Sequence, residues 1–233
     1  MTPTPQKAPA TAPADQTSTA NTPWIISYLT LRKTVGLLGV SLVPVLVIGS
    51  FIIDHLINGQ PATIQTSVSA YYYTSMRNEL EGIIFGIGMF LLCYDGYDRQ
   101  DSIISKLAGL FGLCIALFPT SPTSEKGDIV SVIHYVAAGI FFALLAYMSV
   151  FLFTKSSGYP TSQKVSRNRI YRVCGIVMAV AVIGIPLDGI TPIWDKIGFL
   201  HPTLILELLA LTAFGSSWLT KGEFWMNDRE LVL

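Results

Sequence analysis

Six long hydrophobic segments take up most of the chain and leave few folds open to it. They cover residues 34–53, 77–96, 107–124, 129–154, 169–188 and 200–220. A helix of about 20 apolar residues crosses the ~30 Å hydrocarbon core of a bilayer. A helix is favoured there because it satisfies its backbone N–H and C=O groups within its own segment. The sequence therefore predicts an all-α protein, a polytopic bundle of six transmembrane helices over residues 34–222.

The composition supports a lipid environment. Charged residues make up 13% of the chain and hydrophobic residues 51%, whereas soluble domains carry about 25% charged residues. This argues against a soluble enzyme and makes membrane lipids the expected partners. The 15 basic and 15 acidic residues balance, so nothing indicates a nucleic-acid partner. Cys93, Cys114 and Cys174 lie in apolar stretches without a CxxC pair, so the sequence predicts neither a zinc ribbon nor a disulfide framework.

The segments outside the hydrophobic region have distinct compositions. Residues 1–23 are mostly Thr, Pro and Ala without an apolar run, which predicts a disordered tail. Residues 24–33 combine aromatic residues with Arg32 and Lys33 and are typical of a short interfacial lead-in at the headgroups. Residues 223–233 are expected to form a cytoplasmic tail. Because the N-terminal segment lacks the apolar region of a signal peptide, the expected location is a bacterial inner membrane.

The distribution of Lys and Arg predicts the orientation. With the N-terminus inside, 12 of the 15 basic residues lie in cytoplasmic segments, as the positive-inside rule requires. An odd number of spans would break this bias, so both termini are expected to be cytoplasmic. The loop at 155–172 is rich in Lys and Arg. It is expected to act as a retention signal that contacts anionic lipids, with a specific ligand site as the alternative.

Ionisable residues gather on the expected outer side. All three histidines and 8 of the 15 acidic residues fall there. His134 and Glu207 each lie six residues, about 9 Å along a helix, below the outer end of their span. Ionisable groups at such depth are costly and are functional candidates by default. We expect one hydrogen-bonded network to join them near Arg77, directly or through Ser131, Tyr135 or a water; the alternative is that each is a structural polar group that bridges two helices.

The densest polar stretch, residues 63–78, leads into the second hydrophobic segment. If it is extended, its alternation places Ser69 and Tyr73 on one side, although its three consecutive tyrosines are also typical of an interfacial aromatic belt. Arg77 either pairs with Glu81 four residues later or holds a phosphate or carboxylate bidentately. The resulting candidate outward-facing polar pocket comprises Ser69, Tyr73, Arg77, Glu81, Asp128, His134 and Glu207.

Residues 67–122, SVSAYYYTSMRNELEGIIFGIGMFLLCYDGYDRQDSIISKLAGLFGLCIALFPTSP, resemble a group of uncharacterised bacterial six-span membrane proteins. HYVAAGIFF and ELLALTAFGSSWLTKG, further along the chain, are similar to the same group. The chain distantly resembles the superfamily of alkaline ceramidases and progestin/adiponectin-type receptors, seven-span proteins with a zinc-binding SxxxH motif, an Asp and a late HxxxH. Ser69 fits that motif, but Tyr73 stands at its histidine position, and Ile205 stands four residues after His201. Zinc is therefore not the favoured cofactor.

Three classes of function remain open. The leading one is a protein that binds, senses or transports a small molecule or lipid through the candidate pocket. The second is a membrane-embedded hydrolase of a lipid amide or ester, in which His55, His134 and His201 hold zinc and leave a fourth position for an activated water. The third is a structural or accessory membrane subunit without a ligand.

Overall fold

The structure, a computed structural model, describes residues 28–61, 63–121, 128–156, 159, 161–188 and 200–226. Its elements are α1 (Tyr28–Ser50), the π-helix η1 (Phe51–Ile57), the 3-10 helix η2 (Ser69–Tyr73), α2 (Arg77–Leu92), α3 (Arg99–Leu117), α4 (Ile129–Tyr147), the π-helix η3 (Met148–Leu152), α5 (Ser162–Asp188) and α6 (Pro202–Lys221). No strand occurs among the residues described. The all-α prediction is therefore confirmed.

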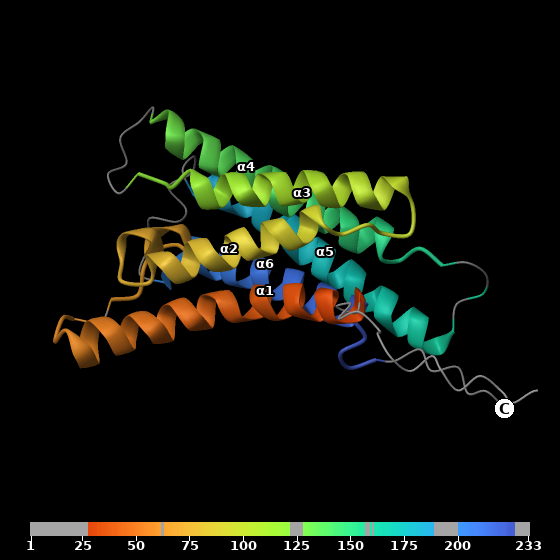
Figure 1. Cartoon of the computed structure of the whole chain (residues 1–233), viewed down its shortest axis with the longest axis horizontal. Helices are drawn as coiled ribbons and strands as arrows, with labels where there is room; N and C mark the ends of the chain where they lie inside the picture. Colours follow the sequence, from red (N-terminus) through yellow and green to blue (C-terminus); the bar gives the residue numbers. More distant parts are fainter. Residues whose placement is uncertain are drawn as a thin grey trace, which may run out of the picture.

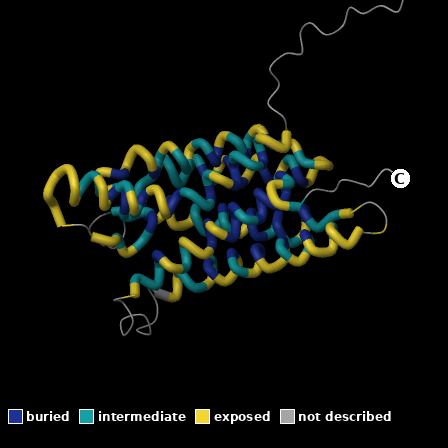
Figure 2. Tube along the Cα trace, turned by 90° about the horizontal axis from the view of Figure 1, so that it is seen from below, coloured by how far each residue is buried: buried dark blue, intermediate teal, exposed yellow. Residues whose placement is uncertain are grey.

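Among the described residues, five helical segments are long and apolar enough to cross a membrane: Tyr28–Ile57, Arg99–Leu117, Ile129–Leu152, Ser162–Leu187 and Pro202–Lys221. Only 28–50% of the residues in their most apolar windows are buried inside the bundle. Large apolar side chains such as Ile48 and Ile183 therefore point outward. Figure 2 shows this pattern, with buried positions inside and exposed positions along the outer faces of the helices. Helices with so much outward apolar surface are compatible with a multi-pass membrane protein.

The helices lie side by side along the long axis of the molecule (Figure 1). α1 packs on α6, α2 on α3, α3 on α4, and α5 on α6. Two of these pairs approach closely through glycine. A Cβ at Gly215 would lie 2.6 Å from the Gly36 carbonyl oxygen, and one at Gly109 would lie 2.7 Å from the Gly88 carbonyl oxygen. Small residues allow backbones to meet in this way in membrane bundles.

Successive helices run in alternating directions, so the polar residues sort to two ends (Figure 1). The end that holds the start of α1, the α2–α3 turn and the end of α6 carries Arg32, Lys33, Arg99, Lys106, Lys155, Lys164, Arg167 and Lys221, and we call it the basic end. The opposite end carries Asp54, Glu79, Glu81, Asp128 and Glu207, and we call it the acidic end.

Four sequence-based expectations concern segments outside the hydrophobic helices. Residues 28–33 of the expected interfacial lead-in form the first turns of α1, whereas the expected tail at 1–23 and residues 227–233 lie outside the described residues. The polar stretch is not extended through Tyr73, because Ser69–Tyr73 form the 3-10 helix η2. The alternation that placed Ser69 and Tyr73 on one side therefore does not apply.

Candidate functional site

A cavity of about 70 Å³ lies among the helices toward the acidic end. It is lined by Leu42, Val68, Ser69, Tyr72, Leu80, Glu81, Ile84, Ile87, Ile115, Ala116, Pro119, Thr120, His134, Ala138, Phe141, Phe142, Glu207 and Leu211. Four of the seven predicted pocket residues, Ser69, Glu81, His134 and Glu207, are thus brought to one cavity. Most of the wall is aliphatic or aromatic, so the cavity is an apolar space with a few polar groups rather than the polar pocket expected.

Glu207 belongs to the second turn of α6 and connects this helix to η2. The backbone N–H of Val68 donates to Glu207 Oε2, with an N···O distance of 2.5 Å. Val68 is the N-cap of η2, and N–H groups at the start of a helix lack intrahelical acceptors. A second bond, from Leu204 N to Thr66 O at 3.1 Å, fastens the same segment to α6. Glu207 therefore receives hydrogen-bond support from the backbone of a distant segment.

His134 closes another side of the cavity from α4. It is 7% exposed, and its Nδ1 lies 2.7 Å from the Phe118 carbonyl oxygen. Phe118 is the C-cap of α3 and precedes Pro119, where the helix ends and its last carbonyl groups need donors. Because a carbonyl accepts, Nδ1 carries the proton, and in the neutral imidazole Nε2 is then an acceptor.

Glu207 and His134 share the cavity, but no direct hydrogen bond joins them among the described residues. Each is bonded to backbone. Ser131 instead donates from Oγ to Asp128 Oδ2 at 2.8 Å, and Tyr135 is 59% exposed. The sequence could not show that each of the two residues has a backbone hydrogen-bond partner nearby.

Arg77 lies outside the cavity at the start of α2. Its Nε is 3.3 Å from Glu81 Oε1, which is the i,i+4 pair predicted from sequence. Its Nη2 donates to the Tyr72 hydroxyl at 2.5 Å, and its guanidinium carbon lies 4.1 Å from the Tyr72 ring centroid. Arg77 therefore already has protein partners, which favours the structural alternative over a bidentate grip on an anion.

Tyr73 and Asp128 also act beside the cavity rather than on its wall. The Tyr73 hydroxyl donates to the Thr120 carbonyl and so ties η2 to the end of α3. Asp128 caps α4, because its carboxylate accepts from Val130 N at 3.1 Å and from Ser131 N at 3.4 Å. The hydrogen bond from the Ser131 side chain holds the pKa of Asp128 below its ordinary value.

The three histidines proposed as zinc ligands are not brought together. His55 is exposed on η1, with Nδ1 3.2 Å from the Gln60 carbonyl oxygen. His201 precedes α6 in the left-handed conformation, with φ of 50°. Within the described ranges, no group of three His, Cys, Asp or Glu residues is arranged to hold a metal ion.

Sequence reasoning missed the apolar wall of the cavity. Phe141 and Phe142 of α4 and Leu42 of α1 supply much of it, but a hydrophobic residue in a transmembrane segment carries no signal that separates a cavity wall from core or lipid contact. Comparison with known protein families, curated proteins and solved structures found no match to this chain. The chemistry of the site therefore follows from its own geometry.

Proposed function

We propose that this protein is a six-span protein of the bacterial inner membrane that binds a small amphipathic ligand in the cavity toward the acidic end. The ligand enters from the outer side, and its polar group meets Glu207, Glu81, Ser69 and His134. The observation that carries the proposal is the convergence of two carboxylates and a buried imidazole, from three different helices, on one largely apolar cavity.

The sixth span is α2. It has 16 residues and is about 24 Å long, somewhat short of the hydrocarbon core. It packs along α3 and against α1, so it lies within the bundle (Figure 1). Six crossings return the chain to its starting side, and the concentration of Lys and Arg at the basic end supports a cytoplasmic position for that end and for both termini.

The polar groups of the cavity select for a ligand that donates hydrogen bonds. The carboxyl groups of Glu81 and Glu207 offer hydrogen-bond acceptors, and Nε2 of His134 is an acceptor when Nδ1 carries the proton. The cation nearest this site in the described structure, Arg77, is paired with Glu81 and Tyr72. An amine or hydroxyl group is therefore favoured over a phosphate or carboxylate.

The size of the cavity limits how much of a ligand it encloses. Its volume of about 70 Å³ is well below the ~300 Å³ at which pockets enclose a whole drug-sized molecule. The cavity therefore suits a headgroup or the first atoms of a chain, while the remainder of the ligand lies along the apolar outer surface of the helices. A long-chain amine or alcohol fits this description.

The test uses photoreactive long-chain alkylamine and alkylphosphate probes with the purified protein in nanodiscs. We expect the amine to label α4 or α6 of the wild-type protein. Glu207→Gln keeps the shape and removes the charge, so it should weaken competition by unlabelled amine at least about tenfold, as expected for the loss of a charge-assisted hydrogen bond. Glu79→Gln is the matched control, because Glu79 is exposed on the first turn of α2 and does not line the cavity.

Equal labelling of the Glu207→Gln variant and wild type, or stronger labelling by the alkylphosphate than by the amine, would refute the proposal. A structural role for Glu207 is the alternative, favoured by its bond to Val68 N. In that case Glu207→Gln would lower the melting temperature without changing probe competition at temperatures where the protein is folded.

A further inference from the structure

The basic end buries positive charge. Arg32 is 8% exposed and Lys221 is 7% exposed. Removing a cation from water costs several kcal/mol unless a counter-ion or hydrogen bonds compensate. The two residues come from opposite ends of the sequence, and α1 and α6 bring them together. A Cβ at Gly222, next to Lys221, would lie 3.3 Å from Arg32 Cβ.

Arg32 is held by aromatic rings. Its guanidinium carbon lies 4.8 Å from the ring centroid of Tyr28, 5.6 Å from that of Tyr94 and 5.8 Å from that of Tyr97. Its buried Nε has no hydrogen-bond partner, and no carboxylate of the described residues forms an ion pair with it. The rings supply cation–π stabilisation, but Nε of the guanidinium is left without a hydrogen-bond partner.

Lys221 is in a similar position at the last turn of α6. Its Nζ lies 4.4 Å from the Tyr97 ring centroid and 5.1 Å from that of Phe153. The C-terminal end of a helix favours a cation, which offsets part of the cost of burying the Lys221 ammonium. Over the residues that the structure describes, Lys221 likewise forms no ion pair with a carboxylate. Tyr97 covers both cations and is itself 70% exposed.

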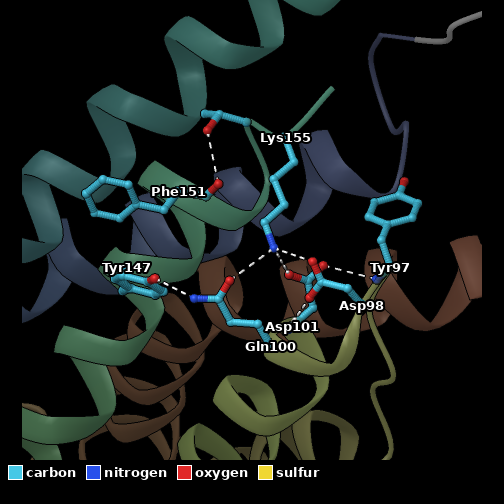
Figure 3. Close-up of polar contacts among 8 residues, drawn as sticks. Tyr97, Asp98, Gln100, Asp101, Tyr147, Phe151 and Lys155 are labelled. Carbon is cyan, nitrogen blue, oxygen red and sulfur yellow. Dashed lines mark hydrogen bonds and ion pairs between the residues drawn. The ribbon is translucent and has the colours of Figure 1, made fainter. Parts of the chain in front are cut away.

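The nearby carboxylates are committed to another cation. Lys155 Nζ lies 2.7 Å from Asp98 Oδ2 and 2.8 Å from Asp101 Oδ1. Figure 3 shows Lys155 reaching into the turn that carries both aspartates, with Tyr97 beside them. Asp101 also accepts from Tyr97 N at 3.0 Å. Both carboxylates are therefore directly paired with Lys155 rather than with Arg32 or Lys221.

We propose that Arg32 and Lys221 form a binding site for a phosphate group at the basic end, beneath Tyr97. The guanidinium fork of Arg32 binds two phosphate oxygens, and Lys221 adds a point charge. Lys164 adds a positive charge nearby: its Nζ donates to the carbonyl of Phe153 at 3.0 Å, the residue whose ring Lys221 contacts. The phosphate comes either from an anionic lipid headgroup at the membrane surface or from a soluble phosphate compound. This inference is independent of the proposed function of the cavity.

The experiment measures thermal unfolding of the purified full-length protein in neutral detergent. One arm adds inorganic phosphate against chloride at equal ionic strength, and the other adds phosphatidylglycerol against phosphatidylcholine. Stabilisation in both arms indicates a site open to soluble phosphate, and stabilisation by phosphatidylglycerol alone indicates a lipid headgroup. We expect Arg32→Gln to raise the apparent dissociation constant at least about tenfold. Arg99→Gln, which removes an exposed cation from the same end, should leave it unchanged.

A second readout separates ligand binding from a structural role. Without ligand, Arg32→Gln should unfold at the same or a higher temperature than wild type, because it removes a buried charge that has no counter-ion among the described residues. Lys221→Met should behave in the same way and likewise lose the response to the phosphate-bearing ligand. The proposal is overturned if neither arm stabilises the wild-type protein, or if Arg32→Gln and Arg99→Gln respond equally.

Discussion

One methyl group at Gly215 tests how closely α1 and α6 approach. In Gly215→Ala the new Cβ would lie 2.6 Å from the Gly36 carbonyl oxygen and 2.7 Å from Val40 N. Ordinary Cβ contacts begin at 3.4 Å, so the two helices must move apart by about 0.8 Å. Because the two polar atoms belong to the backbone of a helix, no change of side-chain rotamer relieves these contacts.

The expected loss of stability follows from two opposing effects. Overpacking of this kind costs typically about 1–3 kcal/mol, and the upper half applies here because backbone must shift. Replacement of glycine by alanine within a helix returns about 1 kcal/mol. The net loss is therefore about 1–2 kcal/mol, which lowers the melting temperature of a chain of this size by about 2–8 °C.

Gly139→Ala is the matched control in α4, because a Cβ at Gly139 has no atom within 4 Å. It should keep only the gain in helix propensity and melt at or slightly above the wild-type temperature. Unfolding can be followed with a thiol-reactive dye, since Cys174 is 7% exposed and reacts on opening, while exposed Cys93 sets the baseline. If Gly215→Ala melts as high as Gly139→Ala, the close α1–α6 crossing is wrong.

Two further predictions concern the loops and use the same unfolding assay. Lys155→Met should lower the melting temperature more than Lys106→Met. The first variant leaves the carboxylate of Asp101, whose side chain is 4% exposed, without its ion-pair partner, whereas the partner of Lys106, Asp95, is 71% exposed. The hydrogen bond from Lys155 lowers the pKa of Asp98, so the pair stabilises the fold at pH values above the unfolded carboxyl pKa of about 3.9. The difference in melting temperature between Lys155→Met and wild type should therefore shrink as the pH falls below that value. Asp128→Ala should lower the melting temperature by uncapping α4, whereas Asp128→Asn, which keeps a capping acceptor, should retain most of the stability; equal losses would contradict the capping role.

The sequence predicted the helices better than their ends. α3 begins at Arg99, eight residues before the uncharged segment at 107, and α5 begins at Ser162 rather than near 169. Hydrophobicity reports which residues suit the hydrocarbon core, but a helix continues beyond it where caps and ion pairs support its ends. At α3 this support is local, because the Asp98 side chain accepts from Asp101 N at 2.9 Å.

The sequence shows how far along a hydrophobic segment an ionisable residue lies, but it does not show how the helix is rotated about its axis. Glu207 and His134 are ionisable residues inside hydrophobic segments, and that signal alone identified them. Whether Arg77 faces the cavity depends on the rotation of α2 and on the path of the segment before it, and neither has a sequence signal. The same limit applied to Lys221, which the sequence assigned to a cytoplasmic segment and the structure buries against aromatic rings.

α6 carries one ionisable residue of each proposed site, and its surroundings stabilise both. Half of its most apolar window is buried, against 28–33% for the other four candidate spans, so it is the most enclosed of the five. Glu207 and Lys221 are 14 residues apart on it, about 21 Å along its axis. Neither residue forms an ion pair with another described residue: Glu207 accepts from Val68 N, and Lys221 meets the helix C-terminus and two aromatic rings. The two proposals therefore place ligands of opposite character at the two ends of α6, a donor at Glu207 and a phosphate at Lys221.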